Sequence, residues 1–363
     1  MTLDRRSALR HLGAAGLAVA AASSPLRARA AGLPSAIRIG VAQPATGTPP
    51  SFSASSAAIA HAKGWIEQEF AADPGTKVEW YFFKGAGPAV NEALTNAQLD
   101  FALQGDLPSI VGKAAGLKTK LVVASGVRSN IYLAVPPDSP IRSIKDLRGK
   151  RVSIFRGTNS QLPILRVLEA NGLAERDIKG INLDTASSLA ALATKDIDAA
   201  FGGIDLLRLR DKNAARIAFS SKGGSPIFTR QSHVLVTEAF ANAHPEATAR
   251  VVKAVVKTAH WSSQEANREE VLRLWARAGT PYDHWKEDYD GEPLRVRLNP
   301  NFDPFLVGRY KDAVVQAERL KLTRSRFDVD PWIDRRFLDA ALKELKLTTY
   351  WPSFQANGLI DGA

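Results

Sequence analysis

The stretch "SIFRGTNSQLPILRVLEANG", residues 153–172, joins a short apolar segment to a predicted helix. Gly157 permits a tight turn, and the "TNS" that follows consists of residue types that cap helix N-termini. Apolar residues then recur at helical spacing as far as the stop signal "NG". Such a strand, turn and helix start directs unpaired N–H groups and the positive end of the helix dipole at one point. The stretch therefore predicts a site for an anion, and an ordinary capped strand-to-helix junction is its alternative.

Strand-like and helix-like segments alternate on both sides of this stretch. The strand-like segments before it lie at residues 36–43, 77–83, 99–106 and 119–126. The alternation restarts at residues 151–157 and continues to residue 221. This pattern predicts an α/β fold of two units with mostly parallel sheets, joined by extended strands and separated by a cleft. From about Ala247 the periodicity is mainly helical.

Ligands in parallel sheets bind beyond the carboxyl ends of the strands, where helix N-termini converge. Four predicted turns have that position, at residues 43–44, 105–106, 157–160 and 202–205.

The first 30 residues have the features of an export signal. Arg5 and Arg6 precede a short apolar run, and "ARA" at residues 28–30 is a small-x-small cleavage site. The paired arginines resemble a twin-arginine signal, with a Sec signal as the alternative. The apolar run is too short to span a bilayer, and no later segment is long enough. We therefore expect cleavage near Ala30 and a periplasmic mature protein.

The charge of the chain is basic but dispersed. Its 48 Lys and Arg outnumber 37 Asp and Glu, for a formal charge of +11. Five arginines and one aspartate lie in the first 30 residues, so +7 remains after cleavage. The scattered basic residues indicate a solvated surface, and no nucleic-acid partner is expected. The chain has no cysteine, which excludes disulfides, thiolate metal sites and a cysteine nucleophile.

Motifs for metals, nucleotides and hydrolysis are incomplete. No "HEXXH", EF-hand loop or suitably spaced histidine pair occurs, so we expect no metal and no cofactor. Residues 112–119 carry Leu117 where a P-loop needs glycine, and residues 85–90 lack the last glycine of a dinucleotide fingerprint. A "GXSXG" elbow is also missing, although a triad with distant members is compatible with the sequence. The missing motifs argue against an enzyme, with a periplasmic hydrolase as the alternative.

Four stretches resemble a known family in their order and spacing. They are "IRIGVAQ", "AHAKGWIEQEF", "LTNAQLDFALQGDLPSIVGKAAG" and "SPIRSIKDLRGKRVSIFRGTNSQLPILRVLEANGL". The chain between Ile37 and Glu246 resembles the periplasmic solute-binding proteins of ABC importers for taurine, alkanesulfonates and nitrate. The resemblance implies a type II periplasmic-binding-protein fold that closes around one small organic anion without performing chemistry. It also implies delivery to an ABC permease in the inner membrane.

We expect the signal to be followed by the two lobes that the resemblance implies. Residues 1–30 are the signal, residues 31–128 and 235–363 form lobe 1 with the C-terminal helices, and residues 129–234 form lobe 2. We expect the mature protein to be a monomer.

Carried over residue by residue, the resemblance also names the ligand contacts. They are Gln43 after the first strand, Gly105 and Asp106 in the next turn, Gly157, Thr158, Asn159 and Ser160 in the anion cradle, and Asp205 after "AAFGGI". Arg156, beside the cradle, is a candidate partner for the anion or an ordinary surface arginine. Arg128 and Arg230 border the predicted crossing strands, where interlobe or solvated ion pairing is the alternative to ligand contact. The two aspartates would repel an anion, so we expect them to cap helices or to hold a ligand amine.

Two departures from the family bear on the ligand. Gly202-Gly203-Ile204 stands where the family often has an aromatic residue, and the loop at residues 43–56 looks longer and richer in Ser, Thr and Pro. Small side chains there leave room for a bulky tail. We therefore expect an aliphatic or aromatic sulfonate or sulfate ester, with nitrate or a thiamine-pyrimidine precursor as alternatives.

Overall fold

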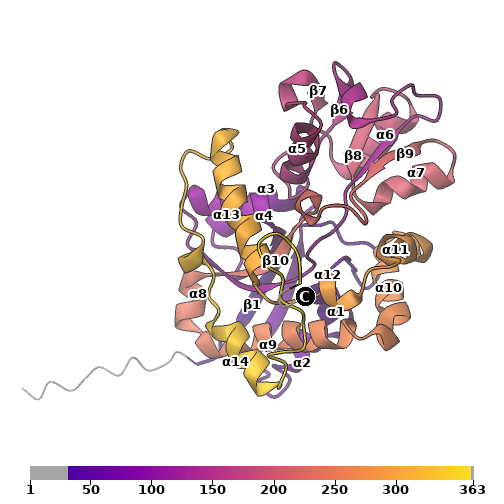
Figure 1. The fold of residues 1–363 in the computed structure, drawn as a ribbon. Coiled ribbons are helices and arrows are strands. Elements are labelled where there is room, and N and C mark those ends of the chain that lie inside the picture. The colour runs from indigo at the N-terminus through magenta and orange to yellow at the C-terminus, as the bar shows by residue number, and fades with distance from the viewer. Residues whose placement is uncertain (1–31, 361–363) are drawn as a thin grey trace, which may run out of the picture. The chain divides into compact units, whose positions relative to one another are not determined.

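The computed structural model describes residues 32–360, and the predicted export signal lies outside them (Figure 1). Residues 32–360 belong to a single compact unit. It contains two five-stranded sheets, each packed with helices. Within residues 32–360, no helix is long and apolar enough to cross a bilayer.

The first sheet has the strand order β2-β1-β3-β10-β4. Its strands are β1 (Ala36–Val41), β2 (Lys77–Phe82), β3 (Phe101–Gly105), β4 (Thr119–Ala124) and β10 (Ser232–Thr237). β1 runs parallel to β2 and β3, whereas β10 runs antiparallel to β3 and β4. Every residue of β3 is buried, as expected for a central strand covered on both faces.

Four helices connect the parallel strands of this sheet. They are α1 (Ser56–Lys63), α2 (Trp65–Gln68), α3 (Ala86–Thr95) and α4 (Asp106–Ala114). The Ser55 side chain caps α1 by accepting from the Ala58 N–H at 3.1 Å. Gly64 ends α1 with a φ of 63°, a left-handed conformation that glycine adopts without strain.

The second sheet has the order β7-β6-β8-β5-β9. Its strands are β5 (Tyr132–Val135), β6 (Arg151–Ser153), β7 (Lys179–Ile181), β8 (Ala199–Gly202) and β9 (Arg216–Ser220). Its helices are α5 (Gln161–Ala170), α6 (Thr185–Ala193) and α7 (Leu207–Asp211). β6 is parallel to β7 and β8, and β5 is antiparallel to β8 and β9.

The predicted α/β class with two mostly parallel sheets is confirmed, with one reversed strand in each sheet. The reversed strands are β5 and β10, which enter their sheets from the two segments that cross between them. A strand that enters in this way is not bound by the right-handed strand-helix-strand connection that orients the others. An isolated antiparallel bridge between Ser129 and Arg230 holds the crossing segments side by side.

The chain after β10 is mainly helical, as predicted. Its helices are α8 (Glu238–Ala243), α9 (Pro245–Ser262), α10 (Arg268–Ala276), α11 (Tyr282–Tyr289), α12 (Leu294–Arg297), α13 (Pro304–Arg319) and α14 (Arg336–Glu344). α9 packs between α1 and α14, so this region extends the core of the first sheet. α13 packs on both α4 and α5 and so links the two sheets.

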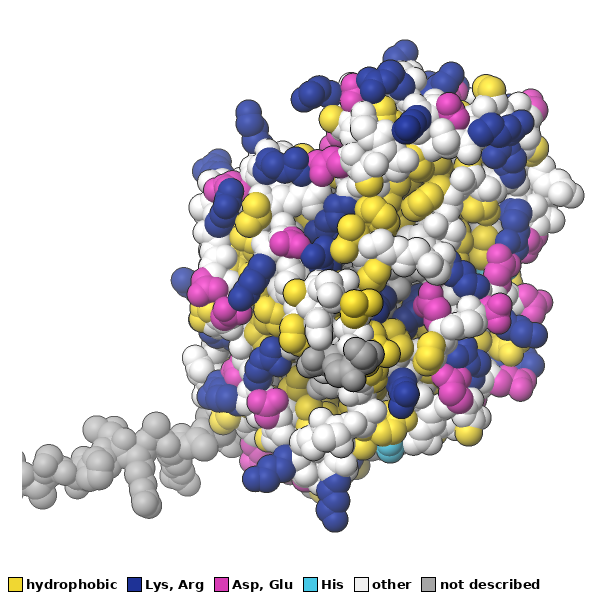
Figure 2. Space-filling model, viewed as in Figure 1, with side chains coloured by type: hydrophobic (Ala, Val, Ile, Leu, Met, Phe, Trp, Pro, Cys, Tyr) yellow, Lys and Arg dark blue, Asp and Glu magenta, His cyan; other side chains and the backbone are white. Residues whose placement is uncertain are grey.

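On the face drawn in Figure 2, Lys and Arg side chains are interspersed with Asp and Glu. This face therefore carries charges of both signs.

Candidate functional site

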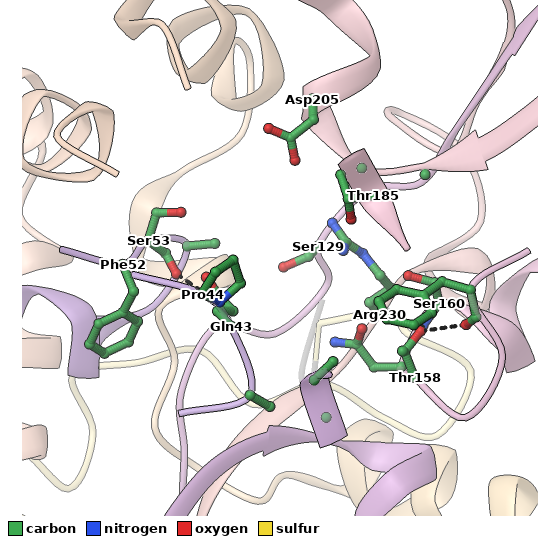
Figure 3. Close-up of a pocket in the computed structure, with 18 of the residues that line it drawn as sticks. Gln43, Pro44, Phe52, Ser53, Ser129, Thr158, Ser160, Thr185, Asp205 and Arg230 are labelled. Atoms are coloured by element: carbon green, nitrogen blue, oxygen red, sulfur yellow. Dashed lines mark hydrogen bonds between the residues drawn. The ribbon is translucent and has the colours of Figure 1, made fainter. Parts of the chain in front are cut away.

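A cavity of about 540 Å³ lies between the two sheets (Figure 3). Its walls come from the segments after β1, β2, β3, β6, β7 and β8, from the crossing segments, and from residues 278–280 and Trp285. Both lobes therefore contribute walls, and the volume is that of an ordinary small-molecule site.

The turn before α5 presents backbone donors to this cavity. Ser160 occupies the N-cap position, but its side chain makes no capping hydrogen bond. The Thr158 hydroxyl instead donates to the Phe155 carbonyl at 2.8 Å and accepts from the Ser160 N–H at 3.3 Å. None of the hydrogen bonds within residues 32–360 takes up the N–H of Thr158 or Asn159. These two groups, at the positive end of the α5 dipole, are available to an anion.

Arg230 brings a positive charge to the same cavity. Its guanidinium points toward the cavity interior in Figure 3, and Nη2 donates to the Asn130 carbonyl at 3.0 Å. No carboxylate in the described part of the chain forms an ion pair with it. Burial lowers the pKa of Arg230, but a guanidinium stays protonated in proteins. A half-buried cation that forms no ion pair favours an anionic ligand.

A buried polar network stands behind Arg230. Asp288 accepts hydrogen bonds from the Tyr132 hydroxyl at 2.6 Å and the Asn130 amide at 3.0 Å. Arg297 donates to the other Asp288 oxygen at 2.8 Å. Both charged side chains of this ion pair are at most 4% exposed. The network fixes Asn130, whose carbonyl in turn holds Arg230.

The turn before α5 touches the end of the first sheet. A Cβ built on Gly105 would lie 2.1 Å from the Cβ of Asn159. The Asn159 amide also donates to the Ser232 hydroxyl at 3.3 Å. Only glycine at position 105 permits this approach of lobe 2 to lobe 1.

Asp205 makes a contact at another part of the wall. Its carboxylate accepts from the Thr280 hydroxyl at 3.0 Å and lies 4.0 Å from Arg208. Arg208 donates to the Gly279 carbonyl. The turn after β8 is thus tied to the loop between α10 and α11.

The cavity collects six of the nine residues named from the sequence. They are Gln43, Gly105, Thr158, Asn159, Ser160 and Asp205. Gln43 donates to the Ser53 carbonyl at 3.4 Å, and Asp205 keeps the contact with Thr280.

The other three residues, Asp106, Arg156 and Gly157, are not in the cavity wall. Arg156 turns away from the cradle and pairs with Glu175 at 2.9 Å, and the Gly157 N–H is used by Gln161 at 2.7 Å. Asp106 is buried at the start of α4, where desolvation raises the pKa of its carboxyl to about 6.

Comparison with known protein families identifies the family of this chain. Residues 57–267 match the model of the NMT1/THI5-like family, which is more than half of the chain. The chain belongs to this family.

Relatives of this NMT1/THI5-like protein carry transport names. It is 29% identical to an aliphatic sulfonates-binding protein of Bacillus subtilis, over 85% of this chain and 88% of the relative. It is 32% identical, with a TM-score of 0.78, to a structure named periplasmic sulfonate-binding protein SsuA from Methylobacillus flagellatus, which covers 89% of this chain and 98% of that one. An alkanesulfonate-binding SsuA from Xanthomonas axonopodis bound to MOPS is 25% identical, with a TM-score of 0.68, over 84% of this chain and 100% of that one.

The expected two-lobed fold is therefore confirmed for this family member. The desulfurization enzyme DszB also has a TM-score of 0.64, covering 85% of this chain and 99% of that one, but at 16% identity the likeness concerns the fold alone.

Sequence reasoning gave too little weight to Arg230 and left out Ser129, Lys84 and Trp285, all of which line the cavity of this NMT1/THI5-like protein. Arg230 and Ser129 lie on the crossing segments and not on strand-to-helix turns. Their position between the two alternating strand-helix patterns is the sequence feature that could have identified them.

No cluster of three or more His, Asp or Glu suited to a metal ion occurs in residues 32–360.

Proposed function

We propose that this chain is the solute-binding component of an ABC importer and that it captures an organic sulfonate or sulfate ester between its lobes. The observation that carries the proposal concerns the Arg230 guanidinium, which forms no ion pair in the described part of the chain. It shares one cavity with the free N–H groups of Thr158 and Asn159. Together they offer charge-assisted hydrogen bonds to a tetrahedral oxyanion. The sulfonate-binding names of the relatives support this choice of head group.

The size of the cavity supports a ligand with a tail. A volume of about 540 Å³ is far larger than nitrate needs, and the wall includes Phe52, Phe155, Phe201 and Trp285. These side chains favour an aliphatic or aromatic group attached to the sulfonate. The MOPS complex of a relative supports a bulky tail as well.

We propose lobe closure as the binding step. Lobe 1 comprises residues 31–128 and 235–363, and lobe 2 comprises residues 129–234. Since β10 begins at Ser232 and belongs to the first sheet, we place the boundary from lobe 2 back to lobe 1 just before Ser232. A ligand that contacts both lobes shifts the population toward the closed state, which the permease then recognises.

Export to the periplasm through the signal at residues 1–30 belongs to the same proposal. The periplasmic name of the Methylobacillus relative supports it. We also propose that the protein acts as a monomer.

We further propose that the ligand is bound and not chemically changed. The Ser109 hydroxyl lies 2.8 Å from His233 Nε2, a spacing typical of a nucleophile and its base. However, Ser109 is not part of the cavity wall, and burial lowers the pKa of His233 to about 3. A histidine that weakly basic is a poor general base at neutral pH. Recovery of the ligand unchanged by mass spectrometry after prolonged incubation tests this point.

The main test is a thermal-shift screen of the mature protein against hexanesulfonate, hexyl sulfate, MOPS, taurine, nitrate and thiamine precursors. A ligand at 100 times its Kd stabilises the folded state by about 2.7 kcal/mol. Arg230→Gln removes a charge-assisted contact of about 1.5–3 kcal/mol, so the Kd of the best sulfonate or sulfate ester rises roughly 10- to 150-fold.

Arg156→Gln is the matched control for Arg230→Gln, because it makes the same change at an arginine that pairs with Glu175 outside the cavity. Its Kd should stay close to that of the parent protein. Stabilisation by nitrate or an uncharged precursor, with none by any sulfonate or sulfate ester, would overturn the proposed cargo.

A further inference from the structure

Six ionisable side chains line the cavity wall. The wall contains three cationic side chains, two carboxylates and one histidine, namely Lys84, Arg208, Arg230, Asp184, Asp205 and His233. Since burial holds the pKa of His233 near 3, this histidine is neutral at physiological pH.

Two of the cations face a carboxylate. Arg208 lies 4.0 Å from Asp205 on the same turn. Hydrogen bonds from Ser187 and the charge of Lys84 lower the pKa of Asp184, which is therefore ionised. Lys84 follows β2 and Asp184 follows β7, and their opposite charges attract each other.

Arg230 is the cation that remains. Asp288 attracts it, but Asp288 is already bound to Arg297, whose charge repels Arg230. Tyr132, the other titratable group of that network, is neutral because burial raises the pKa of its hydroxyl.

Behind the cradle, Asp106 attracts Arg166 and, more weakly, Arg230. Arg297 pairs with Glu292 at 3.4 Å as well as with Asp288. Asp205 also attracts Arg230, but it faces Arg208 more directly. The wall itself, with three cations and two carboxylates, thus carries one net positive charge.

We propose that the cavity is matched to a single negative charge and discriminates against dianionic head groups by charge and not by shape. The inference rests on the proposed sulfonate or sulfate ester function and adds a rule for what that site rejects. One negative charge is offset by Arg230, whereas a second would be desolvated without a partner, which costs free energy. Sulfonates and sulfate esters carry one charge at any physiological pH. A phosphate monoester of the same shape carries two above its second pKa of about 6.

Hexyl sulfate and hexyl phosphate form a matched pair for the test, measured by isothermal titration calorimetry at pH 5 and pH 8. At pH 8 only about 1 in 100 phosphate molecules is a monoanion, so the ratio of the phosphate Kd to the sulfate Kd should rise up to about 100-fold from pH 5. The carboxyl of Asp106, with a pKa of about 6, also titrates in this range. Hexyl sulfate reports the effect of that protein titration, because it does not titrate itself.

A rise of less than about threefold in the ratio would overturn the charge rule. If neither hexyl compound nor any sulfonate binds, the proposed function itself fails. If hexyl sulfate binds and the hexyl phosphate dianion binds equally tightly, only the charge rule fails.

A variant tests the charge count directly. Asp184→Asn removes a negative charge from the wall while leaving a helix cap, since asparagine also caps. The ratio of the phosphate Kd to the sulfate Kd at pH 8 should then fall by about threefold or more. Asp138→Asn is the matched control, because Asp138 is an exposed carboxylate of the same lobe that pairs with Lys195 outside the cavity. An equal ratio in the two variants would contradict the proposal.

Discussion

A methyl group at position 105 should oppose closure of the lobes. The Cβ of Gly105→Ala would lie 2.1 Å from the Cβ of Asn159, whereas carbon atoms in contact stay about 3.5 Å apart. Asn159 must therefore retreat by about 1.4 Å. Gly105 has a φ of −85° and a ψ of 176°, which any residue adopts, so the substitution adds no backbone strain.

The cost of this overlap should appear in ligand affinity. Overpacking of this kind costs about 1–3 kcal/mol, and the lobes relieve it by opening. Because the ligand binds the closed state, its Kd should rise roughly 5- to 150-fold, with little change in the melting temperature of the ligand-free protein. Calorimetry with hexyl sulfate measures the Kd, and a thermal melt measures stability.

Two further variants separate closure from general damage. Asn159→Gly in the Gly105→Ala background removes the clashing Cβ and should restore part of the affinity. Gly75→Ala is the matched control, because a Cβ there meets no atom within 4 Å. An unchanged Kd in Gly105→Ala would refute the closure argument. A large fall in ligand-free melting temperature without recovery in the double variant would also refute it.

Two predictions concern buried charges. Arg297→Met leaves the carboxylate of Asp288 without its cation and should lower the free energy of unfolding by about 3–5 kcal/mol in urea titrations. The double variant Asp288→Asn/Arg297→Met should lose less, and an equal loss would contradict the pairing. For Asp106, burial raises the pKa of the folded state from 3.8 to about 6, so between these pH values the native protein holds a proton that the unfolded chain has released. The free energy of unfolding therefore falls by about 3 kcal/mol as the pH rises through this window. Asp106→Asn removes this pH-dependent contribution. The free energy of unfolding of the variant minus that of the parent should therefore rise by the same amount from pH 4 to pH 7. A difference that stays constant with pH would disprove the raised pKa of Asp106.

The sequence predicted the parts of the site that follow from local periodicity. Gly105 ends a parallel strand, and Gln43, Thr158 and Asp205 follow the ends of others by a few residues. The carboxyl ends of parallel strands meet at one edge of a sheet. The order of strands and helices fixes this edge without any knowledge of the tertiary contacts.

The direction of a single side chain does not follow from that order. Arg156 comes three residues after the end of β6, where the chain has left the strand and its alternation of faces. Its partner Glu175 is 19 residues away, so the ion pair that turns it from the cavity is a tertiary contact. Asp106 likewise belongs to a turn at the correct edge, but its carboxylate is buried at the start of α4.

Arg230 depends on tertiary contacts in a different way. It reaches the cavity because the two crossing segments pair at Ser129, about 100 residues earlier in the chain, and because Asn130 holds its guanidinium. No local pattern brings those residues together. The consequence for function is that the unmatched charge lies on the connection between the lobes, while the free N–H groups belong to lobe 2 and the contact at Gly105 to lobe 1. An anion bound to Arg230 is thus placed where both lobes meet it only on closure, so one interaction can supply both affinity and the signal that the cavity is occupied.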